Sequence, residues 1–558
     1  MLILSTQLTW ATDYYVTQSG AGDYSGQPNF ANAMSVATFN ALTGTGYAGS
    51  TFYFSGEFTT WVEVGISGTV SADGSNDVKL DGWEGGTCTP VASDGCGSAA
   101  DLTIGIVVNE NVAYLDIQDF QVSSTAADYP AFWILDGVNH LRIKKNYVYE
   151  TGGRSINSTC TSGNPCDHVI IEENRVKNFA RLGNSAENFN FDYINYFLIK
   201  GNWVSMEEGF ANYCDSCNIA ASHSCHNVLM ENNDFHDGYG IEDNSTGFAL
   251  KESGQQSEWV IRFNKFHGTT GAGITIGTAF EDPRVWNIYI YGNFMYDNRG
   301  FGGSSYYYAD NHYWWSNLFI NNGGSGLHMW TIDGRDAPTD IYAYNNTFAR
   351  NGDLNPLDTN PTDWTRGGYV SNAGSGHILK NNIFYNNRHT GTYGYQQIGD
   401  STGLTTDYNT LYHSEGTPIW YYDGAARSLA TMQGTYAQET HGEVANPGFT
   451  DPDGVDNTHG TADDDYTLTG ATTVGEDLSA CFSVDLSNGD AWFETLSGYG
   501  QYVQPCIDDA LDPNGTDWTT TPPTVATVKR DTYGWSRGAY AYQTSGIIPI
   551  VLRQFFLD

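Results

Sequence analysis

The middle of the chain repeats one pattern: an apolar residue, any residue, an apolar residue, a short polar run, an asparagine and a second apolar stretch. Three examples are LRIKKNYVYE, VIIEENRVKN and FLIKGNWVSM. The asparagines lie 24 to 36 residues apart, at Asn146, Asn174, Asn202, Asn233, Asn264, Asn293, Asn317, Asn346, Asn382 and Asn409. Self-similarity with a period of about 20–50 residues is typical of solenoids and other repeat architectures.

Each repeat contains the parts of one coil. The alternating apolar residues predict short strands with one face turned inward. An asparagine at a fixed place predicts a turn, because asparagine tolerates left-handed backbone geometry, and stacked asparagines can hydrogen-bond to one another as a ladder. Asp119 stands at the equivalent place one coil earlier. A third strand, often opened by glycine as in AGITIG and SGLHMWT, completes the coil.

Three short strands per coil predict an all-β fold: a right-handed parallel β-helix of about 10–13 coils with an Asn ladder. A leucine-rich repeat is disfavoured because its units are shorter and rich in leucine, and a propeller because its blades are longer and antiparallel.

The pattern divides the chain into four parts. Residues 1–100 are predicted to form an N-terminal cap, with a helix near residues 30–42, and the first coils. Residues 101–412 form the regular β-helix, and 413–543 an irregular C-terminal part. Residues 1–11 are either the remnant of a signal peptide or a first strand. The apolar tail 544–558 either caps the solenoid or, through residues 545–558, associates with a second molecule.

The charge balance excludes one class of partner. Lys and Arg number 24 and Asp and Glu 64, so the formal net charge is −40. Such a surface repels phosphates, so nucleic-acid binding is excluded as a main role. No apolar run reaches the roughly 18 residues of a membrane span, so none is expected.

Cysteines fall in short local pairs that predict disulfides: Cys88 with Cys96, Cys160 with Cys166, and Cys481 with Cys506. Disulfides are typical of an oxidising compartment, so a secreted or cell-surface protein is expected. Cys214, Cys217 and Cys225, close to His223 and His226, leave two alternatives open: a disulfide among the three, or a zinc site.

Both ends of the chain carry further motifs. The N-terminal run DYYVTQSGAGDYSG…ANAMSVATFNAL is similar to the entry cap, and NPGFTDPDGVDNTHGTADDDYTL…RGAYAY to the exit segment, of secreted right-handed β-helix proteins. Residues 12–543 resemble that superfamily, which includes pectate and alginate lyases, polygalacturonases and tailspikes. The resemblance implies an extracellular protein whose partner is a polysaccharide.

The run ALKESG, followed by VIRFN, is similar to a stretch of certain β-helix lyases in which the lysine is the base. That resemblance implies Lys251 as the base, with Arg262 holding a substrate carboxylate. Glu242 and Asp243 precede the strand and are candidates for binding Ca²⁺. A solvated Lys251–Glu252 pair on a turn is the alternative.

Histidines supply candidate proton donors. His223 and His226 lie about one coil before Lys251 and are expected in the same groove. His328 lies in GSGLHMWTIDGRD, two or three coils further along.

Aromatic side chains near His328 are candidates for stacking on sugar rings, because sugar C–H groups pack against aromatic faces. The residues predicted to bind substrate are Trp330, Tyr307, Trp315 and Arg335. The alternative is that these aromatic residues fill the solenoid core.

The acidic run TDPDGVDNTHGTADDDYT offers hard oxygen ligands and a turn glycine, so a Ca²⁺ site is predicted there. Its candidate ligands are Asp451, Asp453, Asp456 and Asp464. A solvated acidic loop is the alternative.

Two functions are compatible with these sequence features. The first is an extracellular enzyme acting on an acidic polysaccharide, a lyase rather than a hydrolase. The second is a non-catalytic surface or filament protein, suggested by the apolar tail and the rod-like repeat.

Overall fold

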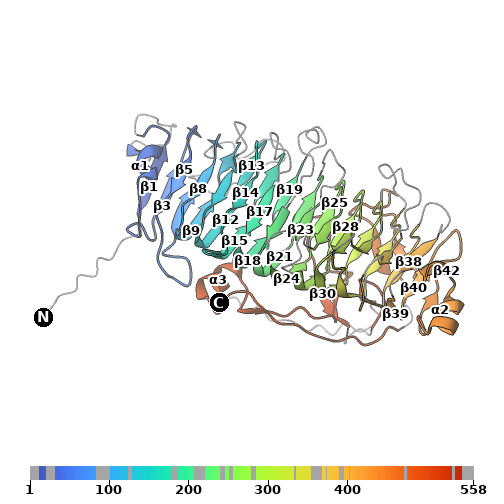
Figure 1. The fold of residues 1–558 in the computed structure, drawn as a ribbon. Helices are drawn as coiled ribbons and strands as arrows, with labels where there is room; N and C mark the ends of the chain where they lie inside the picture. Colours follow the sequence, from blue (N-terminus) through green and yellow to red (C-terminus); the bar gives the residue numbers. More distant parts are fainter. Residues whose placement is uncertain are drawn as a thin grey trace.

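The repeated pattern folds into three long parallel sheets that wind around one axis, in a computed structural model (Figure 1). The prediction of a right-handed parallel β-helix is confirmed. The structure describes residues 12–20, 32–82, 101–123, 129–178, 187–206, 220–238, 246–250, 255–277, 285–331, 335–352, 367–371, 374–388, 395–400, 403–470, 474–530 and 535–542.

Each coil contributes one strand to each sheet, in the order sheet 1, sheet 2, sheet 3. Sheet 1 contains β2 (Met34–Ser35), β1 (Asp13–Thr17), β3 (Thr51–Phe54), β6 (Val78–Asp81), β9 (Ala113–Gln118), β12 (Asn139–Lys144), β15 (Cys166–Glu172), β18 (Ile194–Lys200), β21 (His226–Glu231), β24 (Gln256–Arg262), β27 (Val285–Tyr291), β30 (Ala309–Trp315), β33 (Thr339–Tyr344), β36 (Ile378–Lys380) and β39 (Thr405–Asp407). Sheet 2 contains β4 (Glu57–Phe58), β7 (Asp101–Leu102), β10 (Gln121–Val122), β13 (Tyr147–Tyr149), β16 (Arg175–Lys177), β19 (Trp203–Ser205), β22 (Asp234–His236), β25 (Lys265–His267), β28 (Phe294–Tyr296), β31 (Leu318–Ile320), β34 (Thr347–Ala349), β37 (Ile383–Tyr385), β40 (Thr410–Tyr412) and β43 (Glu443–Val444).

Sheet 3 contains β5 (Val62–Val64), β8 (Ile106–Val108), β11 (Phe132–Ile134), β14 (Ile156–Ser158), β17 (Phe189–Asp192), β20 (Ala220–His223), β23 (Phe248–Leu250), β26 (Ile274–Ile276), β29 (Gly303–Tyr306), β32 (Leu327–Trp330), β35 (Tyr369–Ser371), β38 (Gln396–Asp400), β41 (Ile419–Tyr422) and the antiparallel β42 (Ala425–Arg427). Outside these sheets lie α1 (Val36–Asn40), α2 (Leu429–Tyr436), α3 (Ala491–Ser497), β44 (Phe449–Asp451), β45 (Asp465–Leu468), β46 (Val484–Asp485), β47 (Tyr502–Val503), β48 (Asp509–Leu511) and β49 (Thr527–Lys529). Helix α1 lies within the range predicted for the cap helix. None of the described helices has the length and apolar character that crossing a membrane requires.

The core lies inside the three sheets, because alternate residues of every strand point inward. Equivalent inward residues of neighbouring coils stack directly: the rings of Phe319, Phe348 and Phe384 follow one another at 4.8 Å between centroids. This spacing is the distance between hydrogen-bonded strands, so one apolar column runs along the solenoid axis.

The Asn ladder is confirmed and is wholly buried at its centre. Asn264 Nδ2 donates to Met230 O (3.1 Å), Arg262 O (2.8 Å) and Asn293 Oδ1 (3.0 Å). Its Oδ1 accepts from the backbone and side-chain nitrogens of Asn233, each at 2.9 Å. Each ladder amide therefore satisfies buried backbone groups of its own coil and of the preceding coil, and bonds to the side chain of the following asparagine.

The placement of Asp119 in this ladder is wrong by one residue. Phe120 N–H donates to Asn146 Oδ1 (3.0 Å), so Phe120 occupies the ladder position. Asp119 has φ 60° and corresponds to Lys145 (φ 56°), which precedes Asn146. The left-handed residue of each turn is thus the one before the asparagine, which turns the asparagine side chain towards the carbonyls it binds.

A second ladder, which was not predicted from the repeat, lies at the turn from sheet 2 to sheet 3. Its amides hydrogen-bond in series at 2.8–3.0 Å. Its members are Asn298, Asn322, Asn351, Asn387 and Gln397. The first four each follow a first-ladder asparagine by five residues, so a search for a second period would have found them.

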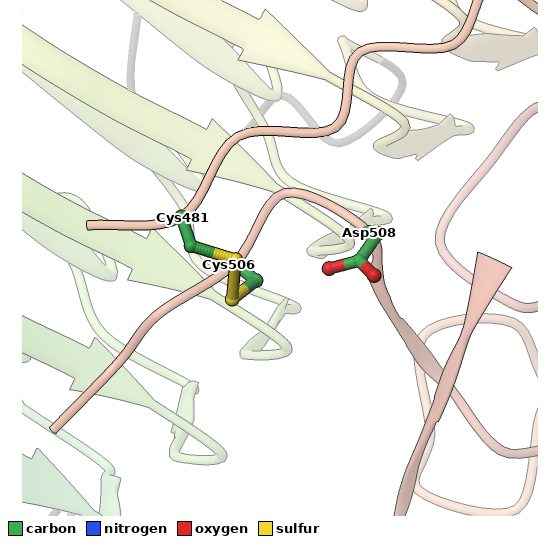
Figure 2. Close-up of side chains that lie close together, drawn as sticks. All are labelled: Cys481, Cys506 and Asp508. Carbon is green, nitrogen blue, oxygen red and sulfur yellow. A yellow bond between two sulfur atoms is a disulfide. The ribbon is translucent and has the colours of Figure 1, made fainter. Parts of the chain in front are cut away.

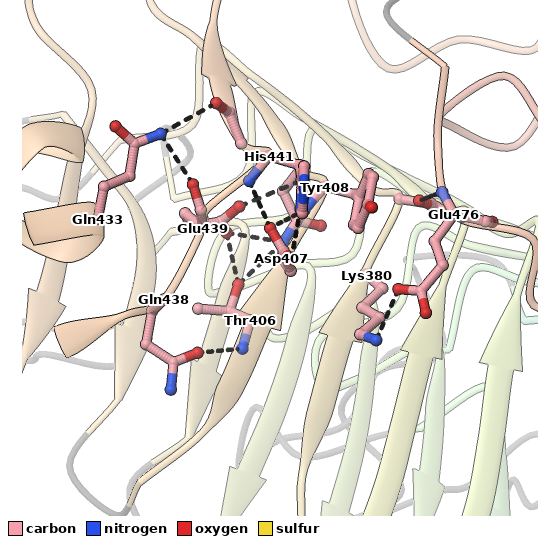
Figure 3. Close-up of polar contacts among 12 residues, drawn as sticks. Lys380, Thr406, Asp407, Tyr408, Gln433, Gln438, Glu439, His441 and Glu476 are labelled. Carbon is pink, nitrogen blue, oxygen red and sulfur yellow. Dashed lines mark hydrogen bonds and ion pairs between the residues drawn. The ribbon is translucent and has the colours of Figure 1, made fainter.

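The first ladder ends on a buried carboxyl group, Glu439 (Figure 3). Its oxygens accept from Asn409 Nδ2 (2.7 Å), Asn409 N (3.2 Å) and the Thr406 hydroxyl (2.5 Å). Burial raises the pKa of Glu439 to about 7. The carboxyl group thus completes the last coil, and its burial favours the protonated, neutral form.

Stability is expected to fall as the pH rises through this range. An unfolded glutamate has a pKa of about 4.3, so above that pH the folded state retains a proton that the unfolded state has lost. The loss saturates once the pH exceeds the folded pKa. For a fully buried group it amounts to about 3 kcal/mol. Urea unfolding at about pH 5 and about pH 8 should show this loss in the wild type and a smaller one in Glu439→Gln.

The same replacement at the exposed Glu57 is the control for this measurement. An equal loss of unfolding free energy in the Glu439→Gln variant and the wild type would show that another group carries the pH dependence.

The C-terminal segment, residues 474–542, runs back along the outside of the solenoid (Figure 1). On sheet 1 it packs Trp492 and Phe493 of α3, among others, against outward apolar residues such as Leu198 and Leu229. On sheet 2 it packs Trp518 against Phe294, with ring centroids 5.4 Å apart. The C-terminal segment therefore covers part of the outer face of each of these two sheets.

Two of the three predicted cysteine pairs are confirmed as disulfides, Cys160–Cys166 and Cys481–Cys506. The third pair, Cys88 and Cys96, lies outside the described residues. The two disulfides fit a secreted protein, and secretion itself stays a prediction.

Candidate functional site

The outer face of sheet 3 carries an Asp–His pair on adjacent strands. Strands β17 and β20 are in register, so Asp192 and His223 lie side by side. His223 Nδ1 lies 3.0 Å from Asp192 Oδ1. An ionised carboxylate only accepts hydrogen bonds, so Nδ1 carries the proton and Nε2 is the atom that can take up another.

His223 Nε2 is buried and has no hydrogen-bond partner in the part of the chain that the structure describes. The side chain of His223 is 17% exposed and that of Asp192 is 24% exposed, so the pair lies at the surface of the sheet without being fully solvated. An imidazole oriented by a carboxylate, with its second nitrogen unpaired, is suited to general-base or general-acid chemistry when a substrate reaches that nitrogen.

Amide side chains continue the polar face from this pair across β17 and β14. Asn190 Nδ2 donates to Asp192 Oδ2 (3.2 Å) and to Asn157 Oδ1 (2.9 Å). Arg154 Nη1 also donates to Asn157 Oδ1 (3.3 Å), and Arg154 Nη2 donates to Glu187 (3.0 Å). Of these residues only His223 was predicted from the sequence. The signal for the others is that Asn157, Asn190 and Asp192 are polar residues at outward positions of predicted strands.

An aromatic cluster lies further along the same face. Tyr306 and Trp330 are paired in register and their rings stack with centroids 5.6 Å apart. The Arg335 guanidinium lies 4.4 Å from the Tyr307 ring centroid. Tyr306 and Tyr307 are buried and Trp330 is half-buried, so Trp330 is the ring that offers a face to a ligand. Three predicted site residues, Tyr307, Trp330 and Arg335, are therefore brought together.

His328 lies in the same cluster but is fully enclosed. Its ring centroid is 4.4 Å from that of Phe301, and neither ring nitrogen has a hydrogen-bond partner among the described residues. Burial lowers the pKa of His328 to about 3, so its ring is neutral at ordinary pH. A neutral, enclosed imidazole is poorly suited to the proton-donor role predicted for it.

The polar network and the aromatic cluster are separated by a distance that suits a chain of sugars. Three strand-to-strand steps lead from β20 through β23 and β26 to β29. At about 4.8 Å per step this is about 14 Å. Both groups thus lie on one face, along the solenoid axis.

Two predicted site residues lie elsewhere, on the outer face of sheet 1 beneath the C-terminal segment. Arg262 donates to Glu231 at 2.7 and 2.9 Å and to Tyr291 Oη at 2.9 Å. Trp315 is fully buried, stacks on Tyr291 with centroids 4.4 Å apart and packs in the cluster under this segment. Both side chains contact the C-terminal segment, and neither reaches the face of sheet 3. The repeat pattern does not predict this contact.

His226 and Cys225 follow His223 but lie on other sides of the turn. His226 begins β21 on sheet 1, where its Nδ1 lies 2.9 Å from Ser257 Oγ. Cys225 is a free thiol fully buried in the core. The core position of Cys225 excludes it from the predicted disulfide and from a zinc site. Cys214 and Cys217 lie outside the described residues.

Several predicted residues also lie outside the described ranges: Lys251, Glu242, Asp243 and the tail 545–558. Leu250, the last described residue of β23, pairs with Ser222. The described pairing of β20 with β23 ends at Ser222 and Leu250. His223 and Lys251 are the next residues along the chain. Self-association through the tail stays a prediction.

The acidic loop between β44 and β45 uses many of its oxygens internally. Asp463 Oδ2 accepts from Val455 N (3.0 Å), and Asp464 Oδ2 accepts from Gly460 N (2.8 Å). In the described residues of this loop no three carboxylates bring oxygens within 4.8 Å of one another. The four predicted ligands, Asp451, Asp453, Asp456 and Asp464, would therefore have to rearrange around Ca²⁺, and calcium binding there stays a prediction.

The cluster of Cys481, Cys506 and Asp508 brings three potential ligand atoms within 4.8 Å (Figure 2). Its two sulfur atoms form a disulfide, and metal-binding cysteines are thiolates. Asp508 instead pairs with Lys529 (2.8 Å). The cluster therefore fastens the C-terminal segment and is not a metal site.

Comparison with known proteins found solved structures that are similar to this chain. No model of a known protein family matches the sequence, and no curated protein matches it. The chain is similar to the A-module of the Azotobacter vinelandii mannuronan C-5 epimerase AlgE4, with 14% identity over 74% of this chain and 99% of that chain and a TM-score of 0.40.

Two further solved structures are similar at the same level. The complex of XylC with xylose has 10% identity over 96% of this chain and 99% of that chain, with a TM-score of 0.47. Pectate lyase Pel9A has 12% identity over 83% of this chain and 92% of that chain, with a TM-score of 0.31. The sheets of this chain establish the β-helix by themselves, and likeness at this level adds no argument about function.

Proposed function

We propose that this protein is an extracellular polysaccharide lyase that binds an acidic polysaccharide along the outer face of sheet 3. The observation that carries the proposal is the Asp192–His223 pair, whose Nε2 is buried and unpaired among the described residues. The aromatic cluster on the same sheet contains no described residue of the C-terminal segment. A half-buried Trp330 on β32, four strand steps from β20, provides a face for a sugar ring.

β-Elimination needs a base at the carbon next to the uronate carboxylate. In the proposed reaction His223 Nε2 takes that proton, the bond from the neighbouring carbon to the glycosidic oxygen breaks, and a carbon–carbon double bond forms. The leaving oxygen then takes up a proton. Asp192 stabilises the imidazolium that forms. Lys251 is the alternative base, and Ca²⁺, when bound, would neutralise the substrate carboxylate.

The test is incubation of the purified protein with alginate, pectate and other uronate polymers, with and without Ca²⁺. A lyase produces ultraviolet absorbance from the new double bond. New reducing ends without that absorbance would replace the lyase by a hydrolase. Neither product from any polymer would overturn the enzymatic proposal.

A further inference from the structure

A cavity of about 350 Å³ lies along the turns that join sheet 3 to sheet 1. Four successive coils contribute to its wall, around the starts of β15, β18, β21 and β24. Its wall includes Pro165, Tyr193, Asn195, Ser224, His226 and Gln255. Ligand pockets in proteins have volumes of roughly 300–1,000 Å³, so this cavity is large enough for a small ligand.

The described wall of the cavity combines polar and apolar side chains and carries no Asp, Glu, Lys or Arg. Ser224 is 4% exposed, and its hydroxyl is buried without a hydrogen-bond partner in the described structure. A buried hydroxyl without a partner costs about 1–3 kcal/mol, so a ligand hydroxyl that completes its hydrogen bonding gains affinity. Burial lowers the pKa of His226, and its neutral ring offers one donor and one acceptor.

We propose that this cavity is a binding site for an uncharged sugar residue. The amide and hydroxyl groups of Asn195, Ser224 and Gln255 match the alternating donors and acceptors of sugar hydroxyls. Tyr193 and Pro165 provide apolar surface for the C–H face of a pyranose ring. A phosphate or a carboxylate would find no cationic side chain in the described wall.

The cavity and the Asp192–His223 pair lie on opposite sides of one turn. His223 ends β20 on sheet 3, Ser224 forms the turn with φ 60°, and His226 begins β21. A sugar in the cavity can therefore be a neutral branch of the polysaccharide bound on sheet 3. That branch role rests on the proposed function, whereas the binding of a neutral sugar does not.

The experiment is saturation-transfer NMR on the full chain with the methyl pyranosides of glucose, galactose, mannose and xylose, and with methyl glucuronide. At least one neutral pyranoside is expected to bind with a Kd on the order of 1–10 mM, and the glucuronide more weakly. Ser224→Asn should weaken the signal, because asparagine tolerates the positive φ and its longer side chain replaces the unpaired hydroxyl and intrudes on the cavity. Tyr193→Asn (φ 49°) should weaken it by removing the ring.

Lys145→Asn is the matched control, since it makes the same replacement at φ 56° on a distant turn and should leave binding unchanged. His223→Ala should also leave it unchanged, which separates this inference from the proposed reaction. If Ser224→Asn does not fold, Tyr193→Asn and His226→Gln test whether the sugar binds in the cavity. Absence of binding by every neutral pyranoside, equal binding of the glucuronide, or full binding by the cavity variants would overturn the inference.

Discussion

Replacement of His223 by alanine is expected to lower kcat on the best uronate polymer by about 10²–10⁴-fold, the contribution of a positioned general base. His223 Nε2 is the proton-accepting atom of the pair, and Asp192 holds the opposite nitrogen at 3.0 Å. Asp192→Asn should also lower kcat strongly, because an amide in that place can donate to Nδ1 and favour the wrong tautomer. The measurement is the initial rate of double-bond absorbance.

His441→Ala is the matched control, because Asp407 and His441 form a second Asp–His pair, also at 3.0 Å, at the C-terminal end of the solenoid (Figure 3). Its removal should leave kcat unchanged. Lys251→Ala separates the two candidate bases. Full activity of His223→Ala together with loss of activity in Lys251→Ala would assign the base to Lys251 and contradict the role given to His223.

Replacement of Glu231 by leucine is expected to lower the free energy of unfolding by about 3–5 kcal/mol, because it leaves a buried guanidinium without its counter-charge. Glu231 is 2% exposed and accepts from Arg262 and from the Tyr499 hydroxyl. Burial by itself would raise the pKa of Glu231, but Arg262, the Tyr499 hydroxyl and Lys200 together outweigh burial and hold the pKa below its usual value. Urea unfolding measures the loss.

The double variant Glu231→Leu with Arg262→Leu should be more stable than Glu231→Leu, because removing both charges leaves no uncompensated ion in the interior. Tyr499 belongs to the C-terminal segment, so the single variant should also be cut by protease within residues 474–542 sooner than the wild type. Additive effects of the two replacements would show that the ion pair is not coupled and would contradict the role given to Glu231.

Repetition explains why the fold could be predicted so fully. Asn146 to Asn409 recur at one place in each coil, and each makes the same buried bonds to the coils before and after it. The identity of the left-handed residue could not be seen in the pattern, since Lys145, Glu173 and Asn232 share positive φ but no side-chain chemistry. Glu439 was missed for a related reason: it ends the ladder without resembling its members.

Prediction of the site from sequence alone was limited by the same regularity. In all three sheets, outward residues alternate with inward ones in the same way. The repeat therefore predicts equal exposure for Arg262 on sheet 1 and His223 on sheet 3. The C-terminal segment distinguishes the two sheets, because it covers side chains on sheet 1. Its Tyr499 lies over Arg262, and the ring centroid of its Phe482 lies 6.5 Å from that of Trp315. Aromatic residues on one face were correctly expected near His328, yet the enclosure of His328 depends on Phe301 from the neighbouring coil.

The amino-acid sequence by itself determined the coil, its three strands, the ladder and two local disulfides, because all of these depend on residues near one another or on a strict period. Only the tertiary structure decided which outer faces the described C-terminal segment covers, which cations are neutralised inside ion pairs, and that Asp192 lies beside His223. Those outcomes depend on contacts between residues that are about 30 to almost 300 positions apart, such as Tyr499 with Glu231. No local pattern in the chain encodes such contacts.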